Sequence, residues 1–280
     1  MIERNKAKGM LWGLVVGDCL GSPIQFSGKD SHPYITEMEP CPVFRLPPGY
    51  WTDDSSMAFC VMDSFIKKGE YDLKDIANNF VRWYKDGFWS SVEGRAFDVG
   101  CATANACRAI ERGCLVNGTE ESQGNGSIMR FAPSYLIARA AGGLPNAMYE
   151  ISDLTHASER VRGVVDKMAN VLDEHFSGVR TSEASAYTTR SAVNVSGWAV
   201  STLEAALWAF HSTTTFEEGM IAAVNLGGDS DTIAAVYGQI AGAFYGFDAI
   251  PKRWIEKVKS AAEVENEINC FLTKVLANDE

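Results

Sequence analysis

Positive charge is scarce in this sequence. Its 280 residues include 25 Lys and Arg against 36 Asp and Glu, which gives a formal net charge of −11 at pH 7. Broad electrostatic attraction to nucleic acid or to anionic lipid is therefore not expected. A small anionic ligand would need a local source of positive potential, such as a helix N-terminus, a metal ion or a few arginines.

Paired cysteine motifs and long apolar runs are also missing. The seven cysteines are odd in number and none forms a C-x-x-C pair, which predicts reduced thiols in a cytoplasmic protein rather than zinc ligands or a disulfide framework. The apolar run at residues 10–16 is short for a signal peptide, and Asp18 lies directly after it. No stretch approaches the roughly 20 apolar residues of a membrane span, so no span is expected.

The sequence is rich in apolar residues at helical spacing. Hydrophobic residues make up 46% of the chain, enough for a substantial core without disulfides or metals. In residues 53–69 and 73–87 they follow the i, i+3, i+4 pattern, whereas strand-like alternation is almost absent. We therefore predict an all-α fold, a single compact multi-helix domain over residues 1–280. Further helices are predicted at 100–113, 126–142, 145–155, 158–176, 198–211, 216–225, 230–246 and 252–278.

Two stretches lack this periodicity. Residues 27–52 hold most of the prolines, and residues 177–197 are rich in Ser, Thr and Gly. Both are predicted to be loops. Long loops in a compact domain are commonly functional or mobile.

An acidic cluster precedes each of two apolar helices. The clusters are Thr52, Asp53 and Asp54 in "WTDDSS" and Asp229, Asp231 and Thr232 in "GGDSDT". One interpretation is N-capping, in which these side-chain oxygens accept hydrogen bonds from the free backbone N–H groups of the helix start. Capping accounts for one acid per helix, so it remains a possible interpretation of either cluster taken alone.

A metal site accounts for both clusters together. Carboxylates packed side by side repel one another unless a cation lies between them. Asp carboxylates and Thr hydroxyls are hard oxygen ligands that suit Mg²⁺ or Mn²⁺. Since adjacent residues do not share one helix face, we expect the ligands in the turn before each helix. Four carboxylates could hold two divalent cations about 3.5–4 Å apart.

Three further features favour a nucleotide-like ligand. The Gly-interrupted loop 122–133, "SQGNGSIMRFAP", opens an apolar helix whose backbone N–H groups could hold a phosphate, although Gly and Asn also make ordinary turns. His156 lies between two predicted helices, and Trp198 starts another. A lone histidine is more often structural and a tryptophan more often part of the core, but either could contact a ligand here, Trp198 by stacking.

Taken in order, these motifs resemble those of one enzyme family, the ADP-ribosylglycohydrolases. The family includes the dinitrogenase-reductase-activating glycohydrolase and the ADP-ribosylarginine and ADP-ribosylserine hydrolases. The resemblance implies an all-helical fold with a cleft that holds two divalent cations, Mg²⁺ or Mn²⁺. It runs from about residue 9 to residue 246 and is carried by "GLVVGDCLGSPIQF", "WTDDSSMAFCVMDSF", "AFDVG", "QGNGSIMRFAP", "THASERVRG", "STLEAALWAF" and "GGDSDTIAAVYGQIAGAFYG".

Carried over position by position, the resemblance assigns three sets of residues. The implied metal ligands are Thr52, Asp53, Asp54, Asp229, Asp231 and Thr232. The implied catalytic residues are Asp98, which matches the general base proposed for arginine-specific members, together with Asp54 and Asp229. The implied substrate contacts at the diphosphate and its neighbouring ribose are Ser122, Asn125, Gly126 and Ser127. Gly228 and Ser230 are implied beside the metal-bound ribose, and Gln123 or Trp198 at the adenine. His156 matches a histidine that contacts the substrate.

Gln25 departs from the pattern of the family, whose first motif usually ends in glutamate, as in "GDALGAPVEF". Glutamine keeps the size of glutamate but cannot act as a base and is a poorer metal ligand. The substitution lowers the odds of a serine-type mechanism and leaves open an altered or lost activity.

The resemblance thus predicts a metal-dependent hydrolase that removes ADP-ribose from a modified protein, most simply from arginine by cleaving the N-glycosidic bond. Its partner would be an ADP-ribosylated protein or free ADP-ribose. Two alternatives stay open: a catalytically altered protein that only binds ADP-ribose, and a two-metal phosphohydrolase that attacks a nucleotide-like substrate at phosphorus.

Overall fold

The structure, a computed structural model, describes residues 2–140 and 143–277, and most of them are helical. Within these ranges, extended backbone pairs only in isolated bridges, Cys41 with Leu46 and Gly124 with Trp198. The all-α prediction is confirmed. The α-helices are α1 (Arg4–Gly21), α2 (Asp53–Lys68), α3 (Leu73–Asp86), α4 (Cys101–Ile110), α5 (Phe131–Arg139), α6 (Ala147–Asp153), α7 (Glu159–Phe176), α8 (Ala199–His211), α9 (Phe216–Val224), α10 (Ser230–Tyr245), α11 (Lys252–Lys257) and α12 (Ala261–Val275); the short 3₁₀ turns are η1 (Ser22–Ile24), η2 (Asn125–Ser127), η3 (Arg190–Ala192) and η4 (Phe247–Ala249).

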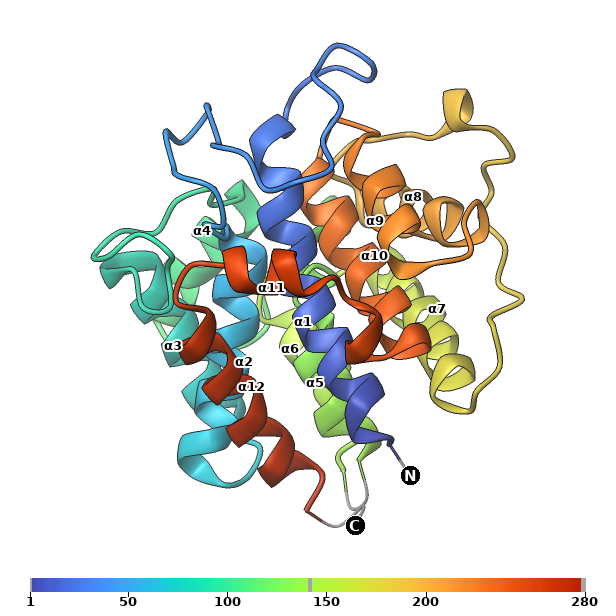
Figure 1. Ribbon diagram of the computed structural model, residues 1–280. Coiled ribbons are helices and arrows are strands. Elements are labelled where there is room, and N and C mark those ends of the chain that lie inside the picture. Colours follow the sequence, from blue (N-terminus) through green and yellow to red (C-terminus); the bar gives the residue numbers. More distant parts are fainter. Residues whose placement is uncertain (1, 141–142, 278–280) are drawn as a thin grey trace.

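Helix α1 runs through the middle of the molecule, beside α10 (Figure 1). It is absent from the helices predicted by periodicity. Every residue from Gly9 to Gly21 is buried, Asp18 included. A helix that is buried on all sides has no polar face, so it produces no amphipathic pattern in the sequence.

A ladder of glycines explains how closely α1 and α10 pack. Gly9, Gly13, Gly17 and Gly21 recur every four residues and so share one face of α1. A Cβ atom on Gly13 would lie 2.1 Å from the carbonyl oxygen of Gly238, and one on Gly21 would lie 2.4 Å from the Cα of Asp231. Only glycine permits such an approach of two backbones. The contact is antiparallel, so the C-terminal end of α1 lies against the first turn of α10.

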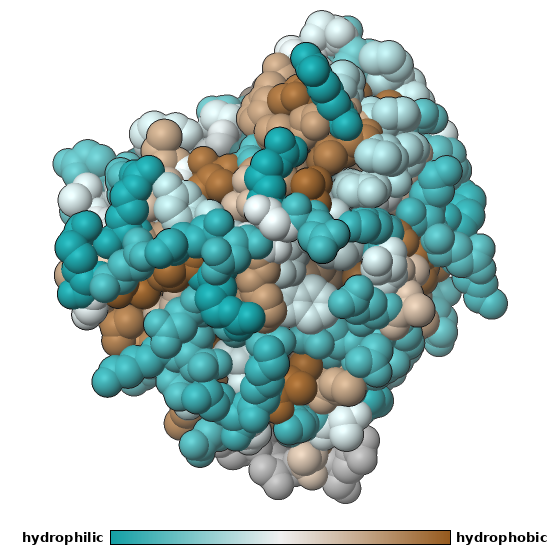
Figure 2. All heavy atoms as spheres, turned by 90° about the vertical axis from the view of Figure 1, so that its left-hand side faces the viewer, coloured by the Kyte–Doolittle hydropathy of each residue, from teal (hydrophilic) through white to brown (hydrophobic). Residues whose placement is uncertain are grey.

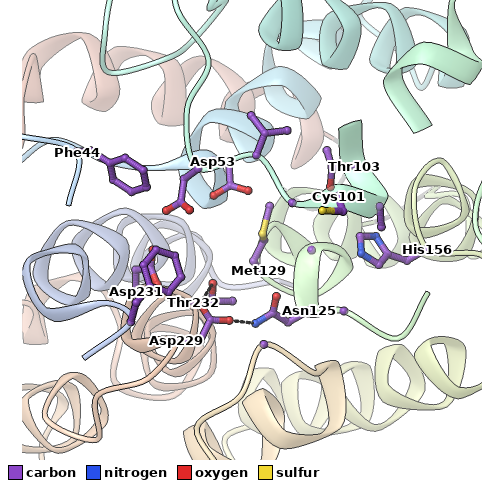
Figure 3. A pocket seen from close by; sticks show the side chains of 18 residues that line it. Phe44, Asp53, Cys101, Thr103, Asn125, Met129, His156, Asp229, Asp231 and Thr232 are labelled. Carbon is purple, nitrogen blue, oxygen red and sulfur yellow. Dashed lines mark hydrogen bonds between the residues drawn. The ribbon is translucent and has the colours of Figure 1, made fainter. Parts of the chain in front are cut away.

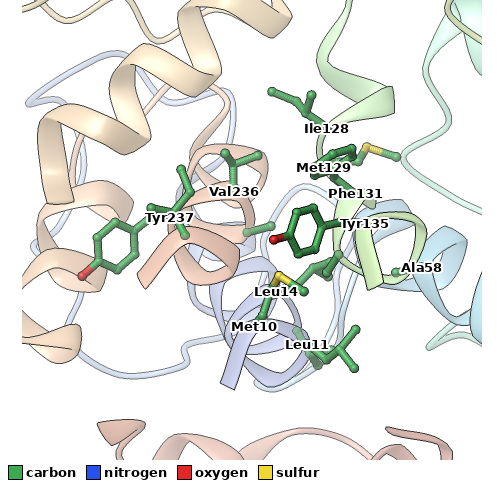
Figure 4. Close-up of a cluster of buried hydrophobic side chains, with 14 of the residues drawn as sticks. Met10, Leu11, Leu14, Ala58, Ile128, Met129, Phe131, Tyr135, Val236 and Tyr237 are labelled. Carbon is green, nitrogen blue, oxygen red and sulfur yellow. The ribbon is translucent and has the colours of Figure 1, made fainter. Parts of the chain in front are cut away.

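The main hydrophobic core surrounds this helix pair. Side chains from α1, α5 and α10 meet in it, with Met10 and Leu14 facing the ring of Tyr135 (Figure 4). Tyr237, at the far side of α10, donates a hydrogen bond of 3.0 Å to the carbonyl oxygen of Phe216. On the outside, polar residues dominate the face drawn in Figure 2, and apolar residues form separate small areas between them.

The predicted helix boundaries lie within three residues of the observed ones except in two places, and the predicted ends at 142 and 278 lie outside the described residues. The helix predicted at 126–142 begins only at Phe131, because η2 and a turn occupy the first residues. The helix predicted at 252–278 is divided into α11 and α12, and Ser260 between them has a left-handed φ of 51°. No Gly or Pro marks that break in the sequence.

The two predicted loops are irregular as expected, and they hold each other. Lys29 Nζ donates to the carbonyl oxygens of Arg190, at 2.9 Å, and Val193, at 2.7 Å. Asp30 forms an ion pair of 2.6 Å with Arg190. All seven cysteines, which lie in the described ranges, are unpaired thiols. Nowhere in residues 2–140 and 143–277 is a helix both long and apolar enough to cross a bilayer.

Candidate active site

A cavity of about 590 Å³ lies where the starts of α2 and α10 meet the segment 98–103 and the loop at 124–126 (Figure 3). Its volume suits a ligand of nucleotide size. Eight of the predicted site residues line it: Asp53, Asp98, Asn125, Gly126, His156, Asp229, Asp231 and Thr232.

Two more predicted residues, Thr52 and Asp54, are buried directly behind this lining. The Thr52 hydroxyl lies 3.3 Å from Asp54 Oδ2, and the Thr232 hydroxyl lies 3.4 Å from the same oxygen. Asp54 therefore connects the two acidic clusters, which are more than 170 residues apart in the sequence.

The remaining predicted residues lie outside the cavity lining. The hydroxyls of Ser127 and Ser230 are buried, Ser127 against Ser152 at 2.7 Å and Ser230 against the carbonyl oxygen of Gly21 at 2.8 Å. Gly228 pairs through its backbone with residues 26 and 27. Ser122, Gln123 and Trp198 lie further out, with the Trp198 side chain 54% exposed. Their substrate roles stay predictions.

Asp18, which is not among the predicted site residues, organises the start of α2. Its Oδ1 accepts from the backbone N–H of Thr52 at 2.8 Å and from the Thr52 hydroxyl at 2.9 Å. Its Oδ2 accepts from the backbone N–H of Ser55 at 3.0 Å and from the Ser55 hydroxyl at 2.6 Å. A side chain of α1 thus caps α2 from outside and complements its helix dipole.

N-capping, the simpler explanation of the acidic clusters, does not account for them. Thr52 and Asp229 occupy the N-cap positions of α2 and α10, yet neither side chain accepts a capping hydrogen bond. Asp53, Asp54 and Asp231 lie in the first turn of each helix, so the prediction that all ligands lie in the turn before it is wrong. Their oxygens are therefore available for another role.

The acids outnumber the donors that could satisfy them. The Thr232 hydroxyl has one proton to share between Asp54 Oδ2 at 3.4 Å and Asp229 Oδ1 at 3.5 Å. Asn125 Nδ2 donates to Asp229 Oδ2 at 2.5 Å. Among the described acids of this site, three buried carboxylate oxygens have no hydrogen-bond partner: Asp54 Oδ1, Asp98 Oδ2 and Asp231 Oδ1. Unpartnered buried oxygens of this kind are costly and call for a proton or a cation.

The electrostatics agree with this count. Burial, followed by repulsion from Asp98, raises the pKa of Asp53 and of Asp231 well above the usual value. Burial, followed by repulsion from Asp18, does the same to the pKa of Asp54. Burial also raises the pKa of Asp98 to about 7 and that of Asp18 to about 6. A bound divalent cation would offset both the cost of burying the charged carboxylates and their mutual repulsion.

The donor chemistry suits Mg²⁺ or Mn²⁺, since the two acidic clusters contribute carboxylate and hydroxyl oxygens, while Cys101 and His156 line the other side of the cavity. In the part of the chain that the structure describes, no three Asp, Glu, His or Cys side chains are already arranged as the ligands of one ion. The residues fit the ions by their chemistry and by their unpartnered oxygens.

His156 faces the other side of the cavity, away from Asp53 (Figure 3). Burial, followed by the charge of Arg130, lowers its pKa to about 3, so the ring is neutral. Arg130 Nη2 donates to the Thr155 hydroxyl at 2.7 Å, and that hydroxyl lies 2.7 Å from His156 Nδ1. If Thr155 donates its own proton to Nδ1, the ring proton is on Nε2, which can donate into the cavity.

Two glycines let the backbone pass close to this ring. A Cβ atom on Gly126 would lie 2.7 Å from His156 Cε1, and one on Gly124 would lie 3.2 Å from His156 Nε2. The end of loop 177–197 completes the wall, because Asn125 N–H donates to the Gly197 carbonyl and Asp229 N–H to the Val195 carbonyl, both at 3.0 Å.

Gln25 lies beside Asp98 and lowers its pKa, against the larger effect of burial. The Gln25 side chain is 2% exposed, and neither its Nε2 nor its Oε1 makes a hydrogen bond of normal geometry. Gln25 therefore lies next to Asp98 but outside the cavity lining.

Comparison with known proteins agrees with the family resemblance of the sequence motifs. The family described as ADP-ribosylglycohydrolase matches residues 1–279. The chain belongs to this family. It is 35% identical to the ADP-ribosylarginine hydrolase Tri1 of Pseudomonas putida, covering 93% of this chain and 76% of that one. It is 30% identical to the ADP-ribosyl-[dinitrogen reductase] glycohydrolase of Rhodospirillum rubrum, covering 96% of each.

A solved structure agrees with these relatives. A chain of an ADP-ribosylglycohydrolase-related protein complex superposes with a TM-score of 0.80 at 33% identity, covering 97% of this chain and 98% of that one. This ADP-ribosylglycohydrolase therefore has the all-helical fold of its family over nearly its whole length.

Proposed function

We propose that this protein hydrolyses the N-glycosidic bond between ADP-ribose and the side chain of an arginine in a modified protein. The observation that carries the proposal is the convergence of two acidic clusters and Asp98 on one cavity, whose far side is lined by Gly126 and His156. The relatives named for ADP-ribosylarginine and for ADP-ribosylated dinitrogen reductase support the same acceptor class. A cytoplasmic location stays a prediction.

The acidic side chains would hold two divalent cations, Mg²⁺ or Mn²⁺. The ligands would be Thr52, Asp53, Asp54, Asp229, Asp231 and Thr232. Such ions, when bound, supply Lewis acidity to water and to ribose hydroxyls. The protein's own contribution is to fix the positions of these oxygens. Asp18, on α1, immobilises the start of α2, and the glycine ladder holds the start of α10 against the same end of α1. Asn125 orients Asp229.

The opposite side of the cavity would bind the diphosphate. Gly126 brings its backbone into the cavity lining without a side chain of its own, and His156 Nε2 can donate beside it. Since this ring is neutral, it contributes a hydrogen bond rather than a charge. Arg130, buried behind it, contributes positive potential to a strongly acidic site.

In this proposal Asp98 handles the proton of the attacking water. Its Oδ2 is unpartnered, and the residue lines the cavity beside Asp53 and Asp231. Water forms a new C–O bond at C1″ as the C–N bond to arginine breaks. Asp98 accepts a proton from that water, and a proton is returned to the departing guanidine nitrogen. The surrounding carboxylates stabilise the positive charge that develops on the ribose.

Substitution of single acids tests the proposal. Asp54→Asn and Asp231→Asn keep the side-chain volume and should each reduce release of ADP-ribose from ADP-ribosylarginine by about a hundredfold or more, because the cation sites lose a charged ligand. Asp63→Asn is the matched control: Asp63 is a buried acid on the same helix as Asp54, paired with Lys67 rather than facing the cavity. Full activity in Asp54→Asn or Asp231→Asn would refute the site assignment.

A further inference from the structure

Phe26 has a backbone conformation that its own burial does not explain. It has a φ of 64°, in the left-handed region, which is an outlier for a bulky aromatic residue. Such a conformation is strained and persists only where the surroundings enforce it. Yet the Phe26 side chain is 63% exposed, so the ring gains little from packing in return.

The surroundings that enforce it belong to the active site. Phe26 N–H donates to the Gly228 carbonyl at 2.7 Å, and Gly228 N–H donates to the Ser27 carbonyl at 2.8 Å. This reciprocal pair fixes Phe26 next to the residue that precedes Asp229. The ring is thereby held in the lining of the cavity that contains the acids.

Phe44 supplies a second ring to the same cavity. It belongs to the loop closed by the Cys41–Leu46 bridge, and its ring packs against Phe97, with centroids 5.1 Å apart. Phe97 directly precedes Asp98. One short apolar cluster therefore anchors both an aromatic wall of the cavity and the backbone of the residue expected to act as base.

The position of these rings along the cavity indicates which part of a substrate they would meet. Phe44 and His156 lie at opposite sides, with the acids between them (Figure 3). If the diphosphate lies near His156 and C1″ lies at the acids, the adenosine extends past His156. The group attached to C1″ then extends toward Phe26 and Phe44.

We propose that Phe26 and Phe44 form the subsite for the guanidinium group of the acceptor arginine. The guanidinium is planar, cationic and weakly hydrated, and it stacks on aromatic faces. Both rings line the cavity beside the acids, where the bond from C1″ to the acceptor would lie. This inference rests on the proposed function, because it assumes that ADP-ribose occupies the rest of the cavity.

The test measures binding of free L-arginine by calorimetry to the full-length protein saturated with ADP-ribose and Mg²⁺. We expect measurable binding to the wild type and about five- to tenfold weaker binding to Phe26→Leu, which keeps apolar bulk but loses the aromatic face. Phe26→Tyr should restore it. L-citrulline, which has the same shape without the charge, should bind weakly to wild type and variant alike.

Tyr34→Leu is the matched control, since Tyr34 is in the same loop, is 73% exposed and does not line the cavity. Phe44→Leu should act as Phe26→Leu does, with a thermal unfolding curve recorded to verify that its cluster stays folded.

Weaker ADP-ribose binding by Phe26→Leu would overturn the inference, because the ring would then hold the adenosine end. Equal affinity for arginine and citrulline would overturn it as well. Failure of the proposed function gives a different result. If the wild type binds arginine in the ternary complex but never releases ADP-ribose from ADP-ribosylarginine, the guanidinium subsite stands and the proposed activity is refuted.

Discussion

Replacement of Asp18 by asparagine tests whether one buried carboxylate of α1 organises the metal-binding end of α2. The variant Asp18→Asn keeps an acceptor at Oδ1 for the two bonds from Thr52. At the other position an NH₂ group replaces Oδ2 and faces two donors, the N–H and the hydroxyl of Ser55, which bond the carboxylate at 3.0 and 2.6 Å. The bond from the Ser55 N–H is lost and leaves that buried donor unpartnered, while the Ser55 hydroxyl can only accept a weaker bond from the new NH₂ group.

The size of the effect follows from these contacts. Each hydrogen bond to a charged acceptor contributes about 1.5–3 kcal/mol and a neutral one about 0.5–1.5 kcal/mol, so losing the N–H bond and weakening the hydroxyl bond together cost about 2.5–4.5 kcal/mol. Removal of the charge also relieves repulsion between Asp18 and Asp54, which offsets part of that cost. We expect a net destabilisation of about 2–3 kcal/mol, together with weaker binding of Mg²⁺ because Thr52 and Asp54 lose their fixed positions.

Urea unfolding, monitored by circular dichroism in chelator, measures the change in free energy of unfolding. Titration with Mn²⁺ then measures the effect on metal affinity. Asp248→Asn is the control, since Asp248 is exposed and lies outside the cavity. A change of less than about 0.5 kcal/mol in Asp18→Asn, the range of ordinary surface substitutions, would show that Asp18 does not organise α2.

Two further predictions concern the fold. Gly13→Ala should destabilise the protein by about 3 kcal/mol, because its Cβ would lie 2.1 Å from the Gly238 carbonyl oxygen. At Gly163, an added Cβ would meet no atom within 4 Å apart from the backbone of its own helix, so Gly163→Ala should stabilise α7 by about 0.5–1 kcal/mol. Denaturant unfolding of both variants gives the sign of each change. Equal effects would contradict the close packing of α1 against α10. Burial lowers the pKa of His175 to about 4, so between the ordinary pKa near 6.5 and pH 4 the unfolded chain binds a proton that the folded chain does not. Stability from this residue is present above pH 6.5 and is lost on acidification, by up to about 3 kcal/mol; His175→Phe should flatten the pH dependence of the unfolding free energy, and a parallel curve would refute the assignment.

Helices with one polar face were predictable from the spacing of their apolar residues, whereas fully buried helices needed another signal. α3 and α7 each bury one side, so their apolar residues recur at helical spacing. α10 is buried on all sides from Ser230 to Ala243, and it was recognisable because an acidic cluster precedes its apolar run. α1 is buried all round, and its signal is a glycine at every fourth position, which reports close backbone contact rather than amphipathicity. The break at Ser260 carries no turn residue and depends only on tertiary packing.

The chemistry of the candidate site was predictable from the sequence, but the residues that hold its side chains in position were not. The residue types and spacing of the two acidic clusters are enough to indicate a hard cation, and the structure brings both clusters together through Asp54. Asp18 looks like the end of an apolar run, because nothing local shows that its carboxylate caps a helix 34 residues further along the chain. The aromatic wall likewise depends on a long-range backbone pairing between Phe26 and Gly228, which no local pattern encodes.

The most direct test of the central claim is product analysis after incubation of the wild-type protein with ADP-ribosylarginine, in Mg²⁺, in Mn²⁺ and in chelator. We predict ADP-ribose and free arginine as the only products, formed with metal and not with chelator, which would also show that Gln25 leaves the site active. AMP and a phosphoribosyl-arginine would instead identify a phosphohydrolase, and tight ADP-ribose binding without any product would identify a binding protein. Either result would contradict the proposed glycohydrolase activity.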